Sequence, residues 1–456
     1  MVVAAGQRIH MVGIGGAGMS GIARVLAEKG CKVSGSDLQE SSVTRTLSDM
    51  GVTICLGHAA TNVEDDVQML VISSAIPPDN PELLTASSRG IPVLKRGQML
   101  AQLFNDKMGI AVAGAHGKTT TTSMIYSIFV HCHCDPTFIV GGELQGTKLS
   151  ARLGRSNYAV VEADESDGSF LDLQPYVAVV TNIEDDHLDY YRSLDNIRKA
   201  FRQYIEGVQE GGFALVYGED ISIKAISGGI NTRLVTYGDD EANDYYIRNW
   251  QAEGLGSYFD LYHHGDLVGQ VEIAVPGRHN ALNAAAAIAC GLEMGLDFVE
   301  IQKGIKQFNG AKRRFQIIGS RKDILLVDDY AHHPTEIEAT LAAARGFHPQ
   351  GRLVVIFQPH RYTRTQLLGR QLGESLRQGD LVVITDVYPA GEPSIPGISG
   401  EIVFEAAREA GIECLYLPSL DQVETWLLGA IQPGDLVITM GAGDVWKLGP
   451  VLLEKI

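Results

Sequence analysis

Long apolar runs are missing from this sequence. No stretch reaches the roughly 18 to 20 apolar residues that a membrane-spanning helix needs. Arg8 and His10 interrupt the amino-terminal segment, which therefore lacks the pattern of a secretory signal. Positive charge is also scarce, since 37 Lys and Arg stand against 55 Asp and Glu and give a net charge of −18. Because proteins bind nucleic acids largely by neutralising phosphates, we expect no nucleic-acid partner and no membrane insertion.

Cysteine is sparse as well, with six residues scattered over 456. Disulfide scaffolds are short and dense in cysteine, so we expect reduced thiols, no disulfide framework and a cytoplasmic location. The segment His131–Cys134 alternates His and Cys, but no second ligand pair follows at the spacing of a zinc site, which favours a structural role. No G-x-S-x-G motif is present, and no cysteine has a defined catalytic partner.

The distribution of apolar residues predicts an α/β protein. Short apolar runs alternate with longer amphipathic segments, which is typical of βαβ units and mainly parallel sheets. At roughly 150 residues per domain the length favours three domains. We place these domains at residues 1–105, 106–312 and 313–456. A zone from about 243 to 275, which contains Gly and Tyr, predicts antiparallel hairpins in the second domain.

The most specific motif follows the apolar segment GIAVA and opens the helical segment TTTTSMIYSIFV. Its residues are Gly114, Ala115, His116, Gly117, Lys118, Thr119 and Thr120. Glycines let backbone N–H groups approach phosphate oxygens, Lys118 can reach the β and γ phosphates, and Thr119 can hold a divalent metal. The loop is shorter than the strict G-x-x-x-x-G-K-[ST] pattern. We predict a phosphate-binding loop, and a glycine-rich turn without a ligand is the alternative.

A second glycine cluster, Gly13–Gly18, fits G-x-G-x-x-G between a predicted strand and a predicted helix, and Asp37 follows about twenty residues later. This is the fingerprint of a dinucleotide site, in which a helix N-terminus binds the diphosphate. The same loop would bind any diphosphate, so NAD and a UDP-sugar fit equally well. A glycine turn without a ligand remains an alternative.

Acidic and imidazole side chains follow two strands predicted downstream of the phosphate loop. Glu162 and Asp164 end one strand, and Asp186 and His187 follow the next. Ligands gather at the carboxyl ends of parallel strands. A cation that bridges ATP phosphates takes oxygen ligands and can accept an imidazole, so Thr119, Glu162 and His187 are candidate Mg²⁺ ligands. The alternative is a solvated acidic loop.

Three further features each allow two interpretations. Asn280 lies near the start of a predicted helix, where it caps the helix or contacts an adenine edge. The basic patch Lys312–Arg314 binds a phosphate or forms a solvated linker. Arg361 and Arg364 are three residues apart, so they would share a helix face and could clamp a small carboxylate, or they form a surface pair.

The sequence contains, in chain order, GIGGAGMSG, SSAI, GAHGKTTTT, EADESDGSFL, TNIEDDHLDYY, PGRHNALNAAAA, RRF, DDYAHHPTE, FQPHRYTRT, VYPAGE and GAGD. This series resembles the ATP-dependent Mur ligases of peptidoglycan synthesis over nearly the whole chain. The resemblance implies Rossmann-like amino-terminal and carboxy-terminal domains, which bind a UDP-sugar and an amino acid. Between them it implies a central P-loop ATPase-type α/β domain.

The resemblance also assigns roles to individual residues. It implies that the phosphate loop binds ATP together with Asn280, Arg314 and Asp328. It implies UDP-sugar contacts from Gly15, Gly16, Ala17, Gly18, Asp37 and Ser74. It implies an amino-acid pocket formed by Tyr330, His332, Arg361 and Arg364, and Mg²⁺ ligands at Thr119, Glu162 and His187. The catalytic residues it implies are Lys118, Glu162, His187 and His332, with His332 as a hypothetical general base.

The activity implied by the resemblance is the ATP-dependent joining of L-alanine to the carboxylate of UDP-N-acetylmuramate through an acyl phosphate, by a monomer or homodimer. A ligase that recycles muramyl tripeptide by the same chemistry is the nearest alternative, but it is expected to differ around QPHRYTRT. An NAD-dependent dehydrogenase would leave the second phosphate loop unexplained. A nucleotide-sensing ATPase module would bind ATP without forming an amide.

Overall fold

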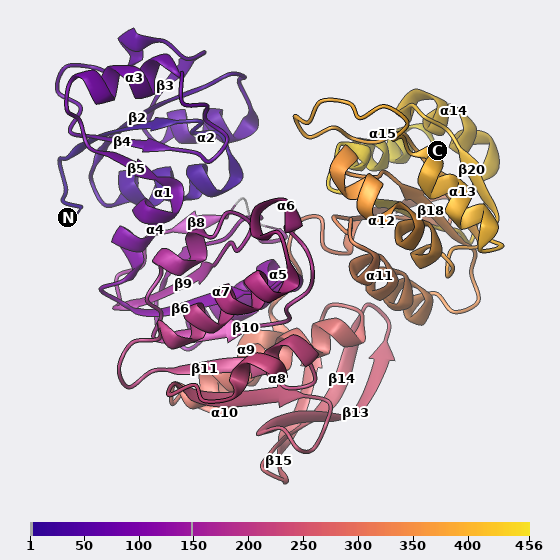
Figure 1. The fold of residues 1–456 in the computed structure, drawn as a ribbon. Coiled ribbons are helices and arrows are strands. Elements are labelled where there is room, and N and C mark those ends of the chain that lie inside the picture. The colour runs from indigo at the N-terminus through magenta and orange to yellow at the C-terminus, as the bar shows by residue number, and fades with distance from the viewer. Residues whose placement is uncertain (1–2, 147–148) are drawn as a thin grey trace. The chain divides into compact units, whose positions relative to one another are not determined.

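The computed structural model describes residues 3–146 and 149–456. Over these residues the strands form three sheets, each with associated helices (Figure 1). The chain divides into two compact units. The first contains Met1–Arg248, Asp260–Gln270 and Leu282–Phe308, and the second contains Asn249–Phe259, Val271–Ala281 and Asn309–Ile456.

The amino-terminal sheet is parallel, with strand order β3-β2-β1-β4-β5. Its strands are β1 (Arg8–Val12), β2 (Lys32–Asp37), β3 (Thr53–Leu56), β4 (Met69–Ile72) and β5 (Val93–Lys95). Its helices are α1 (Ala17–Glu28), α2 (Ser42–Asp49), η1 (Ala60–Asn62), α3 (Pro81–Ser88) and α4 (Arg96–Phe104). The chain leaves β1 toward β2 on one side, and β4 pairs on the other, so the carboxyl end of β1 is a topological switch point.

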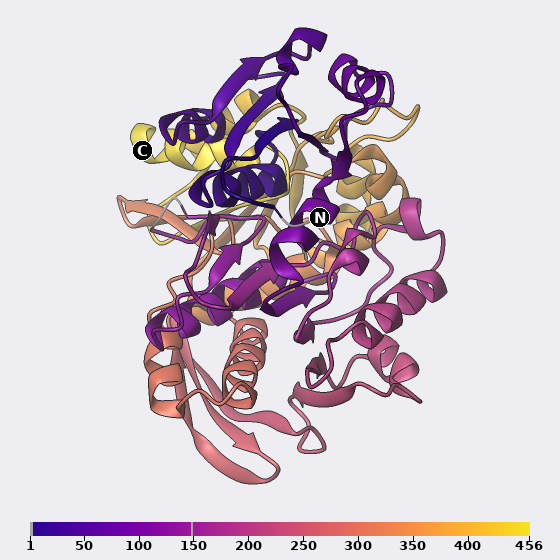
Figure 2. The same cartoon turned by 90° about the vertical axis from the view of Figure 1, so that its left-hand side faces the viewer.

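Helices cover both faces of this sheet (Figure 2). Successive strand residues point to opposite faces. Met11 belongs to one core with Ile22 of α1, while its neighbour Val12 belongs to a separate core with Ala86 of α3. Apolar side chains of β1 therefore lie on both faces of the sheet, although Arg8 and His10 interrupt the strand.

The second sheet has the order β15-β14-β13-β12-β11-β10-β6-β9-β7-β8. Its strands are β6 (Met108–Ala113), β7 (Thr137–Ile139), β8 (Ala151–Arg152), β9 (Tyr158–Glu162), β10 (Val177–Val180), β11 (Phe213–Tyr217), β12 (Arg233–Gly238), β13 (Tyr245–Glu253), β14 (Gly256–His263) and β15 (Asp266–Ile273). Strand β6 pairs in parallel with β9 on one side and β10 on the other. The segments that follow these three strands therefore all begin at the same end of the sheet, where the strands have their carboxyl ends.

The helical segments associated with this sheet are α5 (Lys118–His131), η2 (Ser169–Asp172), α6 (Leu188–Tyr191), α7 (Leu194–Glu206), α8 (Ile221–Ser227), α9 (Arg278–Glu293) and α10 (Phe298–Lys306). Helix α10 packs closely on α5, where a Cβ added to Gly304 would lie 2.9 Å from the Ile128 Cα. The Ser127 hydroxyl donates to the Gly304 carbonyl oxygen at 2.9 Å. This contact fixes α5, whose first residue is Lys118.

The carboxy-terminal sheet has the order β16-β17-β21-β18-β19-β20, in which only the β16–β17 pair is antiparallel. Its strands are β16 (Gln316–Arg321), β17 (Ile324–Asp329), β18 (Leu353–Phe357), β19 (Leu381–Ile384), β20 (Cys414–Tyr416) and β21 (Leu436–Met440). Its helical segments are α11 (Pro334–Phe347), α12 (Tyr362–Ser375), α13 (Glu401–Glu409), α14 (Leu420–Ala430), η3 (Val445–Lys447) and α15 (Leu448–Lys455). Two apolar cores, one on each face, hold this sheet between its helices.

The predicted α/β class with mainly parallel sheets is confirmed. The predicted hairpin zone contains β13, β14 and β15, which are neighbours joined by two-residue connections. Both predicted domain boundaries fall in connecting segments, one between α4 and β6 and the other between α10 and β16. Within the described part of the chain, no helix has the length and apolarity needed to cross a bilayer.

Candidate active site

The phosphate loop joins β6 to α5, and its glycines have backbone conformations that other residues rarely adopt. Gly114 has φ of +138° and Gly117 has φ of +82°. A Cβ at Gly114 would lie 2.1 Å from the Thr181 hydroxyl oxygen, and one at Gly117 would lie 2.8 Å from the Asn283 side-chain oxygen. Positive φ and the lack of space both require glycine at these two positions.

Residues at the end of β10 hold the loop from the other side. The His116 backbone N–H donates to the Asn182 side-chain oxygen at 2.8 Å, and the Asn182 amide donates back to the His116 carbonyl oxygen at 3.0 Å. The Thr181 hydroxyl donates to the same carbonyl oxygen at 2.5 Å. The backbone of the loop is therefore fixed before any ligand binds.

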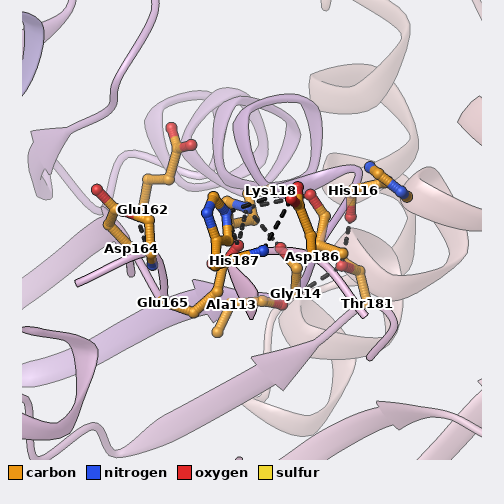
Figure 3. Close-up of polar contacts among 12 residues, drawn as sticks. Ala113, Gly114, His116, Lys118, Glu162, Asp164, Glu165, Thr181, Asp186 and His187 are labelled. Carbon is orange, nitrogen blue, oxygen red and sulfur yellow. Dashed lines mark hydrogen bonds and ion pairs between the residues drawn. The ribbon is translucent and has the colours of Figure 1, made fainter. Parts of the chain in front are cut away.

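Lys118, the first residue of α5, lies among oxygen atoms (Figure 3). Its Nζ atom is 2.7 Å from Glu165 Oε1 and also donates to the carbonyl oxygens of Gly114 and Ala115, at 2.5 and 3.2 Å. Burial alone would lower the pKa of Lys118, but the charges of Glu165 and Glu162 outweigh burial and raise it. Lys118 is therefore a charged ammonium group at neutral pH.

Thr119 and Glu162 face each other next to this ammonium group. The Thr119 hydroxyl is 3.1 Å from both carboxylate oxygens of Glu162, and the Gly141 backbone N–H donates to Glu162 Oε2 at 2.8 Å. A hydroxyl and a carboxylate are the oxygen donors that Mg²⁺ prefers. The donor set of this pair therefore suits the metal that accompanies ATP.

His187 has φ of +58° and directly precedes α6. Its Nε2 atom lies 3.6 Å from Glu165 Oε1 and 3.6 Å from Asp186 Oδ2. Burial lowers the pKa of His187, but its hydrogen bond to the Glu165 carboxylate and the charge of Asp186 outweigh burial and bring the pKa above its usual value. Thus, of the three predicted metal ligands, the structure pairs Thr119 with Glu162. The His187 ring lies near Glu165 and Asp186 instead (Figure 3).

Sequence analysis missed Glu165, whose carboxylate lies beside both Lys118 and His187. Glu165 is 3% exposed, and the Tyr191 hydroxyl donates to its carbonyl oxygen at 2.6 Å. The acidic run EADESD contains four carboxylates, and nothing in their spacing distinguishes the one that turns toward the lysine. Thr120, the last residue of the predicted loop, is buried in the first turn of α5.

A pocket of about 770 Å³ opens at the switch point of the amino-terminal sheet. It is lined by Gly13, Gly15, Gly16, Asp37, Leu38, Gln39, Glu40, Ser41, His58, Ser73, Ala75, Ile76, Pro77, Asp79, Asn80 and Pro81. Asp37 Oδ2 accepts from the Gly15 backbone N–H at 2.8 Å. Three predicted UDP-sugar residues, Ala17, Gly18 and Ser74, are not among the lining residues.

The predicted amino-acid pocket lies at the carboxyl ends of β17 and β18. The rings of Tyr330 and His332 are 5.3 Å apart, and those of His332 and His360 are 5.7 Å apart. Burial is the main reason why the pKa of His332 falls to about 3, and the charge of Arg364 lowers it further against the opposing effect of Glu336. The His332 ring is therefore neutral at neutral pH.

One prediction about this pocket is wrong. Arg361 does not share a helix face with Arg364, because α12 begins at Tyr362 and Arg361 is the residue before it, with φ of +68° and ψ of +136°. The Arg361 backbone N–H donates to the Tyr388 carbonyl oxygen at 2.9 Å, which holds the chain in this positive-φ conformation before the helix. The two arginines thus come from a loop and from a helix.

The cap interpretation of Asn280 is also wrong. Helix α9 begins at Arg278, so Asn280 lies inside the first turn, and its amide donates to the Pro276 carbonyl oxygen at 2.7 Å. A residue that caps a helix N-terminus would instead accept a backbone N–H.

Asp328 and Arg314, the other predicted nucleotide contacts, have partners within the second unit. Asp328 is fully buried and accepts from Arg313 Nε at 2.9 Å and from the Thr439 hydroxyl at 2.7 Å. An Arg314 side-chain nitrogen lies 3.3 Å from Glu336 Oε1. Arg313 is therefore an internal ion-pair partner rather than a solvated linker residue.

The His131–Cys134 segment ends α5 and starts the connection to β7. Among the described residues, this segment brings no set of three metal-ligating side chains together. Burial, and to a smaller extent the neighbouring Cys134, raise the pKa of the Cys132 thiol to about 11.

Family models match three successive parts of the chain. They are the Mur ligase family catalytic domain over residues 8–108, the Mur ligase middle domain over 112–291, and the Mur ligase glutamate ligase domain over 313–443. The fold and the phosphate loop define an ATP-dependent amide-forming ligase of α/β architecture. The chain belongs to the Mur ligase family.

Individual relatives resemble the chain along its whole length. A UDP-N-acetylmuramate–L-alanine ligase from Syntrophomonas wolfei is 58% identical, over 100% of this chain and 98% of the relative. The crystal structure of a UDP-N-acetylmuramate-alanine ligase from Thermotoga maritima aligns with a TM-score of 0.83 at 28% identity, over 98% of both chains. A murein peptide ligase from Psychrobacter arcticus aligns with a TM-score of 0.73 at 25% identity, over 99% of this chain and 98% of that chain.

Proposed function

We propose that the protein joins L-alanine to the carboxylate of UDP-N-acetylmuramate and splits ATP to ADP and phosphate. The observation that carries this proposal is the phosphate loop, in which Lys118 lies beside the Thr119–Glu162 pair. The full-length similarity to a ligase of that name supports the choice of substrates. ATP and UDP-sugars are cytoplasmic metabolites, and we place the reaction in that compartment.

In the first step the muramate carboxylate attacks the γ-phosphorus of ATP, so that an acyl phosphate forms and ADP leaves. The loop N–H groups and the Lys118 ammonium bind the phosphate oxygens and offset their charge. Thr119 and Glu162 would hold Mg²⁺, with His187 as a further candidate ligand. When bound, the metal neutralises charge on the phosphates.

In the second step the alanine amine attacks the acyl carbon, phosphate leaves, and the amine nitrogen loses a proton. His332 is our candidate for accepting that proton. Its Nδ1 atom lies 2.9 Å from the Tyr330 carbonyl oxygen, which can only accept a hydrogen bond. Nδ1 therefore carries the hydrogen, and Nε2 of the neutral ring has a free lone pair.

The amino-acid pocket we propose comprises Tyr330, His332, Arg361 and Arg364, and the ATP contacts include Asn280, Arg314 and Asp328. The UDP-sugar contacts are assigned to Gly15, Gly16, Ala17, Gly18, Asp37 and Ser74. We place the domains at 1–105, 106–312 and 313–456, and expect a monomer or homodimer.

The proposal is tested by measuring ADP formation with all substrates and with each one left out. We expect ADP only when UDP-N-acetylmuramate and L-alanine are both present, together with a product whose mass equals their sum less one water. ATP hydrolysis that is independent of both would instead indicate a nucleotide-sensing ATPase. Replacing L-alanine by a tripeptide separates the alanine-adding activity from peptide recycling. Replacing it by glycine or L-serine measures the selectivity for alanine.

A further inference from the structure

A network of buried polar side chains lies beneath the amino-terminal pocket. Glu82, in the first turn of α3, and Ser36, on β2, are both 0% exposed. His58, in the segment after β3, lines the pocket with a side chain that is 15% exposed. The three residues come from α3, β2 and the segment after β3, elements that Figure 1 labels, and their side chains are joined by hydrogen bonds beneath the pocket.

Glu82 is the fixed charge of this network. Its Oε2 atom accepts from the Ser36 hydroxyl at 2.6 Å, and its Oε1 atom accepts from the Ala59 backbone N–H at 3.2 Å and from the Asn62 amide. Burial alone would raise the pKa of Glu82, but these bonds and one from His10 bring it to about 2. The carboxylate is therefore ionised, and an ionised carboxylate can only accept hydrogen bonds.

The charge of Glu82 determines which nitrogen of His58 carries a hydrogen. A serine hydroxyl has one proton, and Ser36 donates it to Glu82. Ser36 Oγ lies 2.9 Å from His58 Nδ1, so it can only accept there. Nδ1 of His58 therefore carries a hydrogen, so a ring with a single hydrogen keeps the lone pair on Nε2. None of the hydrogen bonds among the described residues involves this Nε2 atom.

We propose that His58 contacts the nucleotide-sugar through Nε2, which accepts a hydrogen bond from an N–H or O–H group of the ligand, and that Ser36 and Glu82 are positioning residues that fix this tautomer. The inference rests on the proposed function for the identity of the ligand. Without a hydrogen on Nε2 the ring cannot donate to a phosphate oxygen, because both atoms are then acceptors. The diphosphate is left to the glycine loop, where N–H groups are available.

The tautomer can be measured without any ligand or activity. Long-range ¹H–¹⁵N spectra of the ring, recorded at pH 8.5 on the full chain, distinguish a hydrogen on Nδ1 from one on Nε2. We expect Nδ1–H for His58 in the unmodified protein and a shift toward Nε2–H in Ser36→Ala. Ser34→Ala is the matched control, because Ser34 lies on the same strand and contacts His10 instead of His58. Nε2–H in the unmodified protein would overturn the inference.

Binding of UDP-N-acetylmuramate, measured by calorimetry without ATP, tests the contact itself. Loss of one hydrogen bond predicts a dissociation constant about fivefold higher in His58→Ala and a few-fold higher in Ser36→Ala. The Ser34→Ala control is expected to bind as the unmodified protein does, and thermal unfolding verifies that each variant is folded. Unchanged binding in folded His58→Ala would overturn the inference.

The two proposals fail in different experiments. If the unmodified protein binds UDP-N-acetylmuramate with the expected His58 dependence but forms no product with ATP and L-alanine, the proposed function fails. If ligation proceeds but neither the tautomer nor the binding depends on Ser36, this inference fails.

Discussion

At the scale of single residues, the phosphate loop holds one ammonium group among carboxylates. Lys118 pairs with Glu165, while Glu162 and Asp164 lie close enough for their charges to raise the pKa of Lys118. An anionic triphosphate placed at the loop would compete with Glu165 for this ammonium group. Glu165 therefore keeps the lysine charged and oriented before the nucleotide arrives.

Replacing Lys118 by alanine removes the ammonium group that we propose binds the phosphates of ATP. We expect kcat to fall by roughly 10²- to 10³-fold, the usual effect of losing one preorganised charge-stabilising donor. Steady-state ADP release provides the measurement. Lys303→Ala is the control, because Lys303 is 55% exposed and pairs with Glu300 on the surface of α10. Ligation at the normal rate by Lys118→Ala would show that the loop has been assigned the wrong role.

Glu162→Gln keeps the shape of the side chain and removes its charge. Since a carboxylate ligand contributes strongly to Mg²⁺ binding, we expect the Mg²⁺ concentration for half-maximal activity to rise by about 10- to 100-fold. Excess Mg²⁺ should restore part of the activity. Glu206→Gln, a half-exposed residue of α7, is the control. If both variants have the same Mg²⁺ dependence as the unmodified protein, Glu162 does not bind the metal.

Glu82 makes the amino-terminal sheet sensitive to acid. Its pKa in the folded protein is about 2, below the value of 4.5 for a free carboxyl. Its stabilising contribution is therefore complete above about pH 4.5 and is lost as the pH falls through 2. The contribution at neutral pH is of the order of 3 kcal/mol.

The pH dependence of Glu82→Gln checks this contribution. The unmodified protein should be the more stable at pH 6, and the difference in unfolding free energy should shrink as the pH is lowered toward 2. A difference that is constant between pH 6 and pH 2.5 would show that the charge of Glu82 is not involved.

Sequence patterns identified the loop but not the orientation of the side chains around it. Lys118 and Thr119 were predictable because a strand, a glycine loop and a helix constrain the local backbone. Glu165 and Arg361 were not, since which carboxylate turns inward and where a helix begins depend on packing against distant segments. The buried partner of Asp328 is of the same kind, because Thr439 is more than a hundred residues away.

At the scale of elements, the position of α5 depends on its contact with α10. A methyl group at Gly304 would lie 2.9 Å from the Ile128 Cα and 3.0 Å from the His131 Cβ, where the backbone cannot yield easily. We expect Gly304→Ala to destabilise the protein by about 1–3 kcal/mol, measured by denaturant unfolding. We also expect faster hydrogen exchange in α5.

Gly346→Ala is the matched control, because it lies in the helix α11 and a Cβ there would meet nothing within 4 Å. Alanine favours helix by up to about 1 kcal/mol relative to glycine, so this variant should be as stable as the unmodified protein or more stable. Destabilisation of both variants to the same extent would contradict the packing explanation.

The order of elements along the chain was predictable, whereas the order of strands in the sheets was not. Apolar runs alternating with amphipathic segments indicate strands and helices because both periods are local. The pairing of β6 with both β9 and β10, which brings Glu162 beside Thr119, involves strands far apart in sequence. The contact between Glu162 and Thr119 was predictable only from the general rule that ligands bind at the carboxyl ends of parallel strands.

At the scale of the whole molecule, a chain with a net charge of −18 is proposed to bind two polyanionic substrates. Repulsion by the overall charge has to be offset locally. We propose that backbone N–H groups at two glycine loops and the half-buried Lys118 provide this offset. This arrangement fits small phosphorylated ligands.

The central claim is that the protein transfers the γ-phosphoryl group of ATP to the carboxylate of UDP-N-acetylmuramate before the amine attacks. Ligation with UDP-N-acetylmuramate labelled with ¹⁸O in the carboxylate tests this most directly, with mass analysis of the phosphate released. The account predicts one ¹⁸O atom in each phosphate, because the carboxylate oxygen that attacks phosphorus leaves with it. Phosphate without label, or label in AMP, would contradict it.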